Sequence, residues 1–316
     1  MPVIYLIDAN SVGYAGQHAA DLKTGDQPTQ AIYNVLMNIR GLMGRTKNAQ
    51  FMYLWDRKAT FRYDLLPEYK EKRADTPEKV KAKEEYHSQQ PFIQRMLKAM
   101  GIPQVFHDGL EADDLGYYLS HHYANKGYTV VLVTSDRDWL QMVAQHENIN
   151  WYDPRFDRSC NHKMFFEFTG YQTAQAYIDS KCIEGDKSDN IDGIDGLGEK
   201  ACQTIFMRWA SVGDMIKEHR ELGEFTKENI GAEFGRYIKK MNAFCSSPDL
   251  IKRYTRNRKL MDLSLAPKPT SLQIVKQPKN PDDFFALCEE LAFHSVLGKR
   301  EVFTNLLFAE KAGAEV

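Results

Sequence analysis

"VIYLID" (residues 3–8) is a short apolar run that ends in an aspartate, and the pattern recurs in "FMYLWD" (51–56) and "TVVLVTSD" (129–136). Runs of this length that are rich in aromatic and β-branched residues predict buried strands. "TQAIYNVLMNIRGLM" (29–43) and "EADDLGYYLSHHYANKG" (111–127) instead carry apolar residues at helical spacing. Strands that alternate with helices predict an α/β domain with a mostly parallel central sheet flanked by helices.

The composition is that of a globular protein with no membrane partner. The chain has 316 residues, of which 43% are apolar and 27% charged. Its N-terminus, "MPVIYLIDAN", lacks a basic leader, and no apolar run approaches the roughly 20 residues that span a bilayer. The five cysteines are scattered and form no C-x-x-C pair. They argue against a disulfide framework or a zinc ribbon and for a cytoplasmic location.

Aspartates stand at the ends of all three predicted strands. They are Asp8, Asp56 and Asp136, and Asp138 follows two residues after the last of them. A single aspartate in such a place is usually a helix cap or a turn residue. In open parallel sheets, however, ligands bind in the crevice beyond the carboxyl ends of the strands. Three strands with the same ending therefore indicate a binding site.

Further acidic residues can join this crevice. They are Glu111, Asp113, Asp114, Asp186 and Asp189. For the first three, an acidic first helical turn is the alternative interpretation. Nine carboxylates in one crevice cannot all stay ionised without cations, and oxygen ligands without His or Cys suit Mg²⁺ or Mn²⁺. Two such ions about 4 Å apart would activate a water and stabilise the leaving oxygen in phosphodiester hydrolysis.

Two segments depart from the strand–helix alternation. Residues 57–90 carry dense mixed charge and few apolar residues, which is typical of a solvated insertion. After Gly170 the pattern becomes mostly helical, with glycine-rich turns. We therefore expect an α/β domain over residues 1–170 and a helical region over residues 171–316.

The stretch "CIEGDKSDNIDGIDGLGEKA" (182–201) combines aspartates with glycines. Its back half, "GIDGLGEKA" (193–201), has the spacing of a helix-hairpin-helix turn, whose N–H groups and following helix favour a phosphate. From Ser188 onward, the same stretch also matches the EF-hand calcium loop at every expected ligand position but the first. Asp195 falls where EF-hands usually have an apolar residue. An EF-hand-like calcium-binding protein is thus one alternative.

Four motifs together resemble the structure-specific 5′-nucleases. These are "FRYDLLPEYKEKR" (61–73), "GLEADD" (109–114), "VTSDRDWLQ" (133–141) and "GDKSDNIDGIDGLGEKA" (185–201). That family includes flap endonucleases, bacteriophage 5′-3′ exonucleases and the N-terminal domain of bacterial DNA polymerase I. The resemblance implies a PIN-like nuclease domain, a helical arch formed by residues 57–90, and a helix-hairpin-helix (H3TH-type) region. Because no polymerase domain follows, we expect the free-standing form; a PIN-type ribonuclease, which would need neither arch nor hairpin turn, is a second alternative.

The resemblance also implies two sets of metal ligands. The ligands of the first ion would be Asp8, Asp56, Glu111 and Asp113. Those of the second would be Asp136, Asp138, Asp186 and Asp189. Asp114 stands where the family has another acid, either as a ligand or behind one. Both ions are expected to be Mg²⁺, with Mn²⁺ able to substitute.

Other residues would contact nucleic acid. By resemblance, Lys70 and Arg73 face the scissile phosphate, where cations stabilise developing charge, and Tyr69 stacks on a base. The glycine turn would bind the duplex backbone without reading its sequence, with a K⁺ ion suggested beside it. The residues expected to bind DNA there are Gly193, Gly196, Gly198 and Lys200.

The expected function is 5′-3′ exonuclease or flap endonuclease activity, which removes RNA primers or 5′ flaps during replication or repair. The expected partners are DNA with a 5′ single-stranded end or flap beside a duplex, RNA–DNA primer junctions and replication proteins. We expect a monomer in a bacterial cytoplasm, or in a host cytoplasm if the gene belongs to a phage. The net charge of −2 is compatible with DNA, because setting aside the nine proposed ligands leaves +7.

Overall fold

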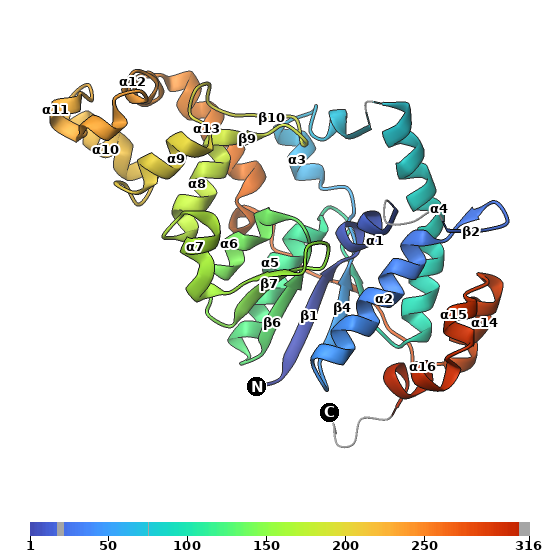
Figure 1. The fold of residues 1–316 in the computed structure, drawn as a ribbon. Helices are drawn as coiled ribbons and strands as arrows, with labels where there is room; N and C mark the ends of the chain where they lie inside the picture. The colour runs from blue at the N-terminus through green and yellow to red at the C-terminus, as the bar shows by residue number, and fades with distance from the viewer. Residues whose placement is uncertain (18–21, 75, 310–316) are drawn as a thin grey trace.

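A seven-stranded sheet forms the centre of the molecule (Figure 1). The structure, a computed structural model, describes residues 1–17, 22–74 and 76–309. Asp75 in the expected arch and residues 310–316 in the expected helical region lie outside the described residues. In spatial order the strands are β11 (Gln273–Val275), β5 (Gln104–Phe106), β4 (Gln50–Leu54), β1 (Val3–Asp8), β6 (Thr129–Val133), β7 (Ile149–Asp153) and β8 (Arg158–Cys160).

The sheet is mostly parallel, as predicted. β5, β4, β1, β6 and β7 run in the same direction, and only the two edge strands, β11 and β8, are antiparallel to their neighbours. Two strands end earlier than the sequence suggested, at Leu54 and Val133. Asp56 and Asp136 therefore lie in the turns just beyond the strands, and only Asp8 is the last residue of its strand.

Alternate residues of β1 enter two different hydrophobic cores. Ile4 and Leu6 pack on one face of the sheet, whereas Tyr5 and Ile7 pack on the other. Near the first face lie α5 (Ala112–Asn125), α6 (Leu140–Val143) and α8 (Ala174–Glu184). The second core is covered by α1 (Ala9–Gln17), α2 (Gln30–Arg45), α4 (Pro77–Ala99), α14 (Pro281–Glu290), α15 (His294–Leu297) and α16 (Arg300–Leu307).

The charged insertion is helical, as the arch interpretation requires. It contains α3 (Thr60–Leu65), the short 3-10 helix η1 (Glu71–Ala74) and α4, which begins after the capping residue Thr76. The first turns of α4 are largely exposed, and its burial begins near Tyr86. α4 continues to Ala99, beyond the expected limit at residue 90, because its later turns pack into the second core. It stands on one side of the carboxyl ends of the strands (Figure 1).

A helical lobe stands on the other side of the same edge (Figure 1). Its helices are α7 (Phe165–Thr169), α8, α9 (Glu199–Phe206), α10 (Val212–Leu222), α11 (Lys227–Ile230), α12 (Ile238–Ser246) and α13 (Pro248–Met261). Between α8 and α9 the chain forms a small antiparallel hairpin from β9 (Gly185–Asp186) and β10 (Ile191–Asp192). The shorter elements of the molecule are β2 (Lys23–Thr24), β3 (Gln27–Pro28), η2 (Arg137–Trp139), η3 (His162–Met164), η4 (Ala232–Phe234) and η5 (Leu263–Leu265).

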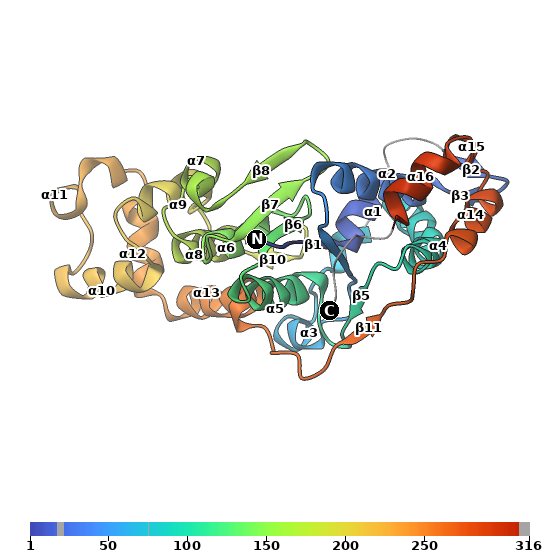
Figure 2. The same ribbon diagram turned by 90° about the horizontal axis from the view of Figure 1, so that it is seen from below.

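The chain does not remain in this lobe to its end. After η5 it returns to the sheet, where β11 pairs with β5, and α14–α16 pack near α2 and α4 (Figure 2). The expected boundary at residue 170 therefore separates segments that share one sheet and one core. Among the helices of the described ranges, none is long and apolar enough to cross a membrane.

Candidate active site

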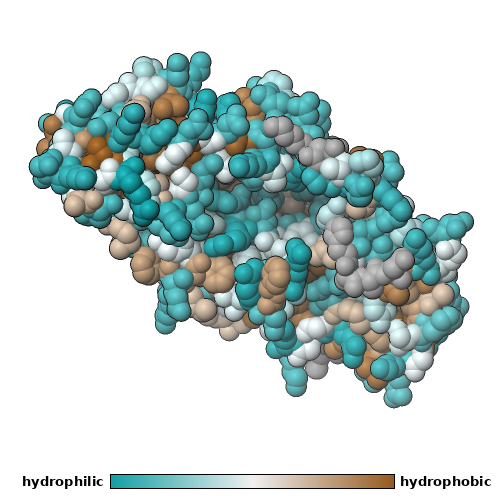
Figure 3. All heavy atoms as spheres, turned by 45° about the horizontal axis from the view of Figure 1, so that its top comes forward, coloured by the Kyte–Doolittle hydropathy of each residue, from teal (hydrophilic) through white to brown (hydrophobic). Residues whose placement is uncertain are grey.

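The carboxyl ends of the parallel strands face a hollow between α4 and the helical lobe. The face of the molecule that carries this edge is hollowed at its middle and is mainly hydrophilic there (Figure 3). All of the carboxylates singled out from the sequence belong to the segments that meet around this edge: β1, the turns after β4 and β6, the start of α5, and the β9–β10 hairpin.

Asp8 and Asp56 are held by hydrogen bonds to both of their oxygens. Asp8, 6% exposed, accepts hydrogen bonds from the Ser11 backbone N–H (2.9 Å) and the Thr134 hydroxyl (2.9 Å). Asp56 accepts from the Ala112 N–H at the start of α5 (2.7 Å) and from the Asn10 side-chain amide (2.7 Å). Burial and the nearby charge of Asp56 raise the pKa of Asp8 to about 7.

Asp113 and Asp136 belong to the same charged group. Burial and the charge of Asp136 raise the pKa of Asp113 well above its usual range, and the charges of Asp8 and Asp56 act in the same direction. Burial and the charge of Asp138 raise the pKa of Asp136 to about 7. Asp8, Asp56, Asp113, Asp136 and Asp138 thus repel one another at this edge of the sheet.

Several cationic groups partly neutralise this crevice. Lys70 Nζ lies 2.5 Å from Glu111 Oε1, and Lys181 Nζ lies 2.9 Å from Asp138 Oδ1. For both lysines burial is the largest single effect and opposes the charged form, but the surrounding acidic groups, led by the facing carboxylate, together outweigh it and raise the pKa. Arg73 binds Asp189 through its Nε, at 2.7 Å.

The arch base, which is α3, η1 and the residues between them (60–74), also forms hydrogen bonds with the β9–β10 hairpin that involve backbone atoms. The Lys70 N–H donates to the Asp189 carbonyl (3.0 Å), and the Asn190 side chain donates to the Glu68 carbonyl (3.1 Å). Lys70 and Asn190 both have positive φ, 61° and 60°. Positive φ is uncommon outside glycine and is found most often at functional sites. This contact between two segments distant in sequence is therefore part of the candidate site.

Asp114 is held by Arg62, so of the two roles left open by the sequence it fits the one behind a ligand better than that of a ligand. Its two oxygens accept hydrogen bonds of 2.7 Å from both terminal nitrogens of Arg62, and one of them also caps the Glu111 N–H. Both side chains are buried, and Arg62 Nε donates to the Leu260 carbonyl of α13 (3.0 Å). Asp114 therefore joins the arch base, α5 and α13.

The structure does not support the expected stacking of Tyr69 on a base. Its side chain is only 4% exposed, and its hydroxyl donates to Glu111 (3.1 Å) and Asp189 (3.0 Å). The ring packs edge-on against Tyr63 at 5.5 Å between centroids. A ring buried in this way cannot stack on a base, so Tyr69 instead connects two acidic residues of the site.

Asp186 is hydrogen-bonded within its own hairpin. Its Oδ1 accepts hydrogen bonds from the backbone N–H (2.7 Å) and the hydroxyl (2.8 Å) of Ser188. Within residues 1–17, 22–74 and 76–309, no three acidic, histidine or cysteine side chains already have the arrangement of a bound metal's ligands. The donor set nonetheless fits hard divalent cations, because it consists of carboxylate oxygens whose burial and mutual repulsion raise their pKa values.

The three glycines of the expected hairpin turn differ in their surroundings. A side chain at Gly193 would place its Cβ 2.1 Å from the Glu184 carbonyl oxygen, so this glycine permits close packing against the end of α8. Gly196 has a φ of +82° and lies under the side chain of Lys240. Gly198 precedes α9 and has open space around it. The last two are the better candidates for contact with a phosphate.

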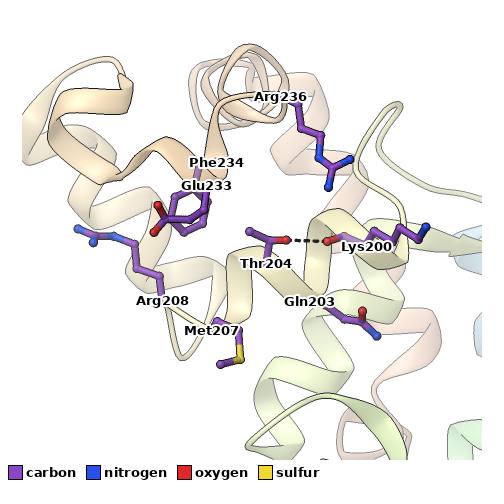
Figure 4. A pocket seen from close by; sticks show the side chains of 8 residues that line it. All are labelled: Lys200, Gln203, Thr204, Met207, Arg208, Glu233, Phe234 and Arg236. Atoms are coloured by element: carbon purple, nitrogen blue, oxygen red, sulfur yellow. Dashed lines mark hydrogen bonds between the residues drawn. The ribbon is translucent and has the colours of Figure 1, made fainter.

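A cavity of about 530 Å³ lies beside this turn, between α9 and the segment around η4 (Figure 4). Lys200 and Arg236 belong to its lining, and Arg236 points toward α9. The Arg208 guanidinium, also in the lining, pairs with Glu218 at 2.5 Å. The exposed lysine and arginine beside Gly196 and Gly198 make this part of the lobe suitable for a polyanion.

Several residues of the site were not singled out from the sequence. Arg62 and Lys181 lie in charged or helical segments where a lone cation carries no signal of its own. Trp139 is fully buried, and its indole N–H donates to Asp113 (2.7 Å). Asn10 follows the end of the first strand by two residues, and its closeness to Asp8 in the sequence is the one local signal of a place in the site.

The comparison with known families agrees with this geometry. The sequence profile described as "5′-3′ exonuclease, N-terminal resolvase-like domain" matches residues 3–173. The chain belongs to this 5′-3′ exonuclease family. The resemblance drawn from the four motifs and the α/β fold class are both confirmed.

Relatives within the family differ in length. A 5′-3′ exonuclease of Aquifex aeolicus is 30% identical over 237 residues, which cover 73% of this chain and 79% of the relative. DNA polymerase I of Mycobacterium bovis is 29% identical over 311 residues, 92% of this chain. The chain spans 31% of the length of that polymerase.

Solved structures share the fold at low identity. The bacteriophage T5 5′-exonuclease with bound zinc has a TM-score of 0.67 and 22% identity, with 92% of this chain and 98% of the T5 chain covered. Human GEN1 in complex with Holliday junction DNA has a TM-score of 0.64 and 14% identity, with 98% of this chain and 75% of that chain covered. The α/β fold of this chain is thus shared with both proteins.

Proposed function

We propose that this 5′-3′ exonuclease family member is a metal-dependent 5′-nuclease that hydrolyses phosphodiester bonds near the 5′ ends of DNA. The observation that carries the proposal is the group of Asp8, Asp113, Asp136 and their acidic neighbours at the carboxyl edge of the sheet. Cations from the arch face this group on one side, and a lobe with exposed basic residues lies on the other.

Two divalent ions, Mg²⁺ or Mn²⁺, would be held by these carboxylates. When bound, the ions supply an activated water and stabilise the leaving oxygen. The residues best placed to hold them are Asp8, Asp56, Asp113 and Asp136. Glu111, Asp138 and Asp189 are paired with Lys70, Lys181 and Arg73, and Asp186 is hydrogen-bonded to Ser188, so these four would have to exchange partners to become ligands.

That exchange would release Lys70 and Arg73 for the substrate. Each sits on the arch base with its cationic group against an acidic residue of the site. Once the carboxylate binds an ion, the lysine or arginine can donate to the scissile phosphate and stabilise the charge that develops on it. The cations of the arch would thus neutralise the empty site and then bind the phosphodiester.

The hollow between α4 and the lobe would receive the substrate. A 5′ single strand would pass at the arch, and the duplex would lie along the lobe, contacted by Gly196, Gly198 and Lys200. Arg236 and Lys240 lie at the same turn and would add phosphate contacts. A K⁺ ion at this turn belongs to the same proposal. Binding of this kind reads the backbone and not the sequence.

The substrates would be 5′ flaps and RNA–DNA primer junctions met during replication or repair. The relatives named DNA polymerase I support a replication context. The experiment is to give the protein Mg²⁺ and end-labelled duplexes with a 5′ flap, a blunt end or an RNA 5′ segment. Cleavage from 5′ ends is expected. Folded protein that cuts none of these substrates would refute the proposal, and cleavage restricted to single-stranded RNA would favour a PIN-type ribonuclease.

The role of Lys70 has its own test. Lys70→Ala should slow single-turnover cleavage about 100-fold or more, the loss typical of one removed electrostatic donor, while duplex affinity falls far less. Lys83→Ala removes an exposed charge from the arch helix and serves as the control. Equal losses of rate and affinity in Lys70→Ala would count against the proposed contact with the phosphate.

A further inference from the structure

Asn10 lies between α4, the arch helix, and the acidic crevice at the ends of the strands. It is the second residue of α1, two positions after Asp8. Its side-chain N–H donates to Asp56 Oδ2 at 2.7 Å. Its side-chain oxygen accepts two hydrogen bonds from α4, one from the Tyr86 hydroxyl (3.0 Å) and one from the Gln90 amide (3.1 Å).

These contacts determine which way the Asn10 amide faces. An amide has one acceptor end and one donor end. Since two donors on α4 hold the oxygen, the NH₂ group must point toward Asp56. The other Asp56 oxygen is held by the Ala112 N–H (2.7 Å), so the orientation of this carboxylate depends on α5 and, through Asn10, on α4.

The contact between α1 and α4 leaves little freedom for this arrangement. Tyr86 is 3% exposed, and its hydroxyl also donates to the Ala9 carbonyl (3.1 Å). Gly13 packs directly under the ring, where an added Cβ would come within 2.6 Å of the hydroxyl oxygen. One turn further along α4, the fully buried Gln89 accepts from the Ala31 N–H (2.8 Å) and donates to Gln17 (2.8 Å). A shift of α4 near Tyr86 would therefore change the position of the Asn10 side chain.

We infer that Asn10 is a positioning residue that couples the arch helix to metal binding at Asp56. The inference rests on the proposed function, because it takes Asp56 as a ligand of a divalent ion. Partners that orient a metal ligand usually contribute 10- to 100-fold to metal affinity. Coupling between two sites is reciprocal, so an arch helix that orients Asp56 must itself be stabilised when the ion binds.

The first test measures Mn²⁺ affinity by calorimetric titration of the full chain without DNA. Asn10→Ala should weaken binding by roughly 10- to 100-fold. Tyr86→Phe keeps the ring and removes only the hydroxyl, so it should weaken binding in the same direction by a smaller factor while the fold is retained. Tyr33→Phe, whose hydroxyl meets Ser295 on an exposed surface, is the matched control and should bind as the wild type does.

The second test is hydrogen exchange of the α4 amides around Tyr86 and Gln90, with and without Mn²⁺. In the wild type, Mn²⁺ should slow their exchange; in Asn10→Ala, saturating Mn²⁺ should leave it unchanged. Wild-type affinity in both Asn10→Ala and Tyr86→Phe, or the same slowing in Asn10→Ala as in the wild type, would overturn the inference. A wild type that binds no Mn²⁺ would overturn the proposed function as well, whereas one that binds Mn²⁺ but cuts no DNA would overturn only the nuclease proposal.

Discussion

Replacing Arg62 tests how the arch base is attached to the rest of the site. The guanidinium makes two hydrogen bonds of 2.7 Å to Asp114 and one of 3.0 Å to the Leu260 carbonyl. Both charged side chains are almost fully buried, at 3% and 1% exposure. Arg62→Met keeps much of the volume but leaves the Asp114 carboxylate buried without its counter-charge. Breaking a buried pair in this way costs about 3–5 kcal/mol of unfolding free energy.

The double variant Arg62→Met/Asp114→Leu should be less destabilised than Arg62→Met alone. It removes both charges and loses the cap on the Glu111 N–H and the hydrogen bond to Leu260, about 1 kcal/mol each. Glu111, which also lies 3.3 Å from Arg62, keeps its ion pair with Lys70. Its expected cost is therefore about 2 kcal/mol. A second mutation that restores stability is the signature of a buried pair whose partners depend on each other.

Urea unfolding followed by circular dichroism measures these differences. The matched control is Arg95→Met, because Arg95 forms the same two-bond contact with Glu290 (3.1 and 2.9 Å) at about half exposure. A surface pair of this kind contributes less than about 1 kcal/mol. A double variant less stable than Arg62→Met, or a loss in Arg62→Met no larger than in Arg95→Met, would refute the reasoning.

Two further predictions concern packing and pH. Gly193→Ala should lower the unfolding free energy by about 1–3 kcal/mol, because its Cβ would meet the Glu184 carbonyl, whereas Gly198→Ala, with open space around it, should unfold at the same urea concentration as the wild type. The pKa of Asp8 and of Asp136 is raised to about 7 from 3.8, so the metal-free protein should lose stability as pH rises from about 4 to 7 and then level off. Mg²⁺ binds the ionised form, so the rise in melting temperature it causes, followed by calorimetry, should be larger at pH 8 than at pH 5; an equal rise at both would contradict the assignment of these acids.

Strands β1, β4 and β6 and the acids near their ends could be predicted because their signals are local. Each of the three is an apolar run long enough to recognise, and a parallel sheet brings its carboxyl ends together whatever the loops do. The parallel strands β5, which has only three residues, and β7 were not predicted. The edge strands β8 and β11 have only three residues each, and all three of β11 are exposed. Segments of three residues are too short to show a periodic pattern, and their strand conformation depends on pairing with the neighbouring strand.

The roles of Tyr69 and Asp114 were hard to predict for a different reason. The type and position of each residue suited the expected role, but the role depended on what packs against the side chain. Tyr69 is covered because the β9–β10 hairpin binds the arch base, and Asp114 is occupied by Arg62, 52 positions earlier in the chain. Partners so distant in sequence leave no trace in the local pattern.

The pairing of β11 with β5 also bears on the order in which a growing chain can fold. All nine acids of the candidate site leave the ribosome before β11 does, and while they do, the outer edge of β5 stays unpaired. The apolar sides of α2 and α4 likewise stay partly uncovered until Phe284 and Phe285 are synthesised, since both are almost fully buried in the folded protein. Open strand edges and uncovered apolar faces promote association between nascent chains. A synthesis stopped at residue 170 or 262 would therefore release a chain that has most or all of these acids but is prone to aggregate.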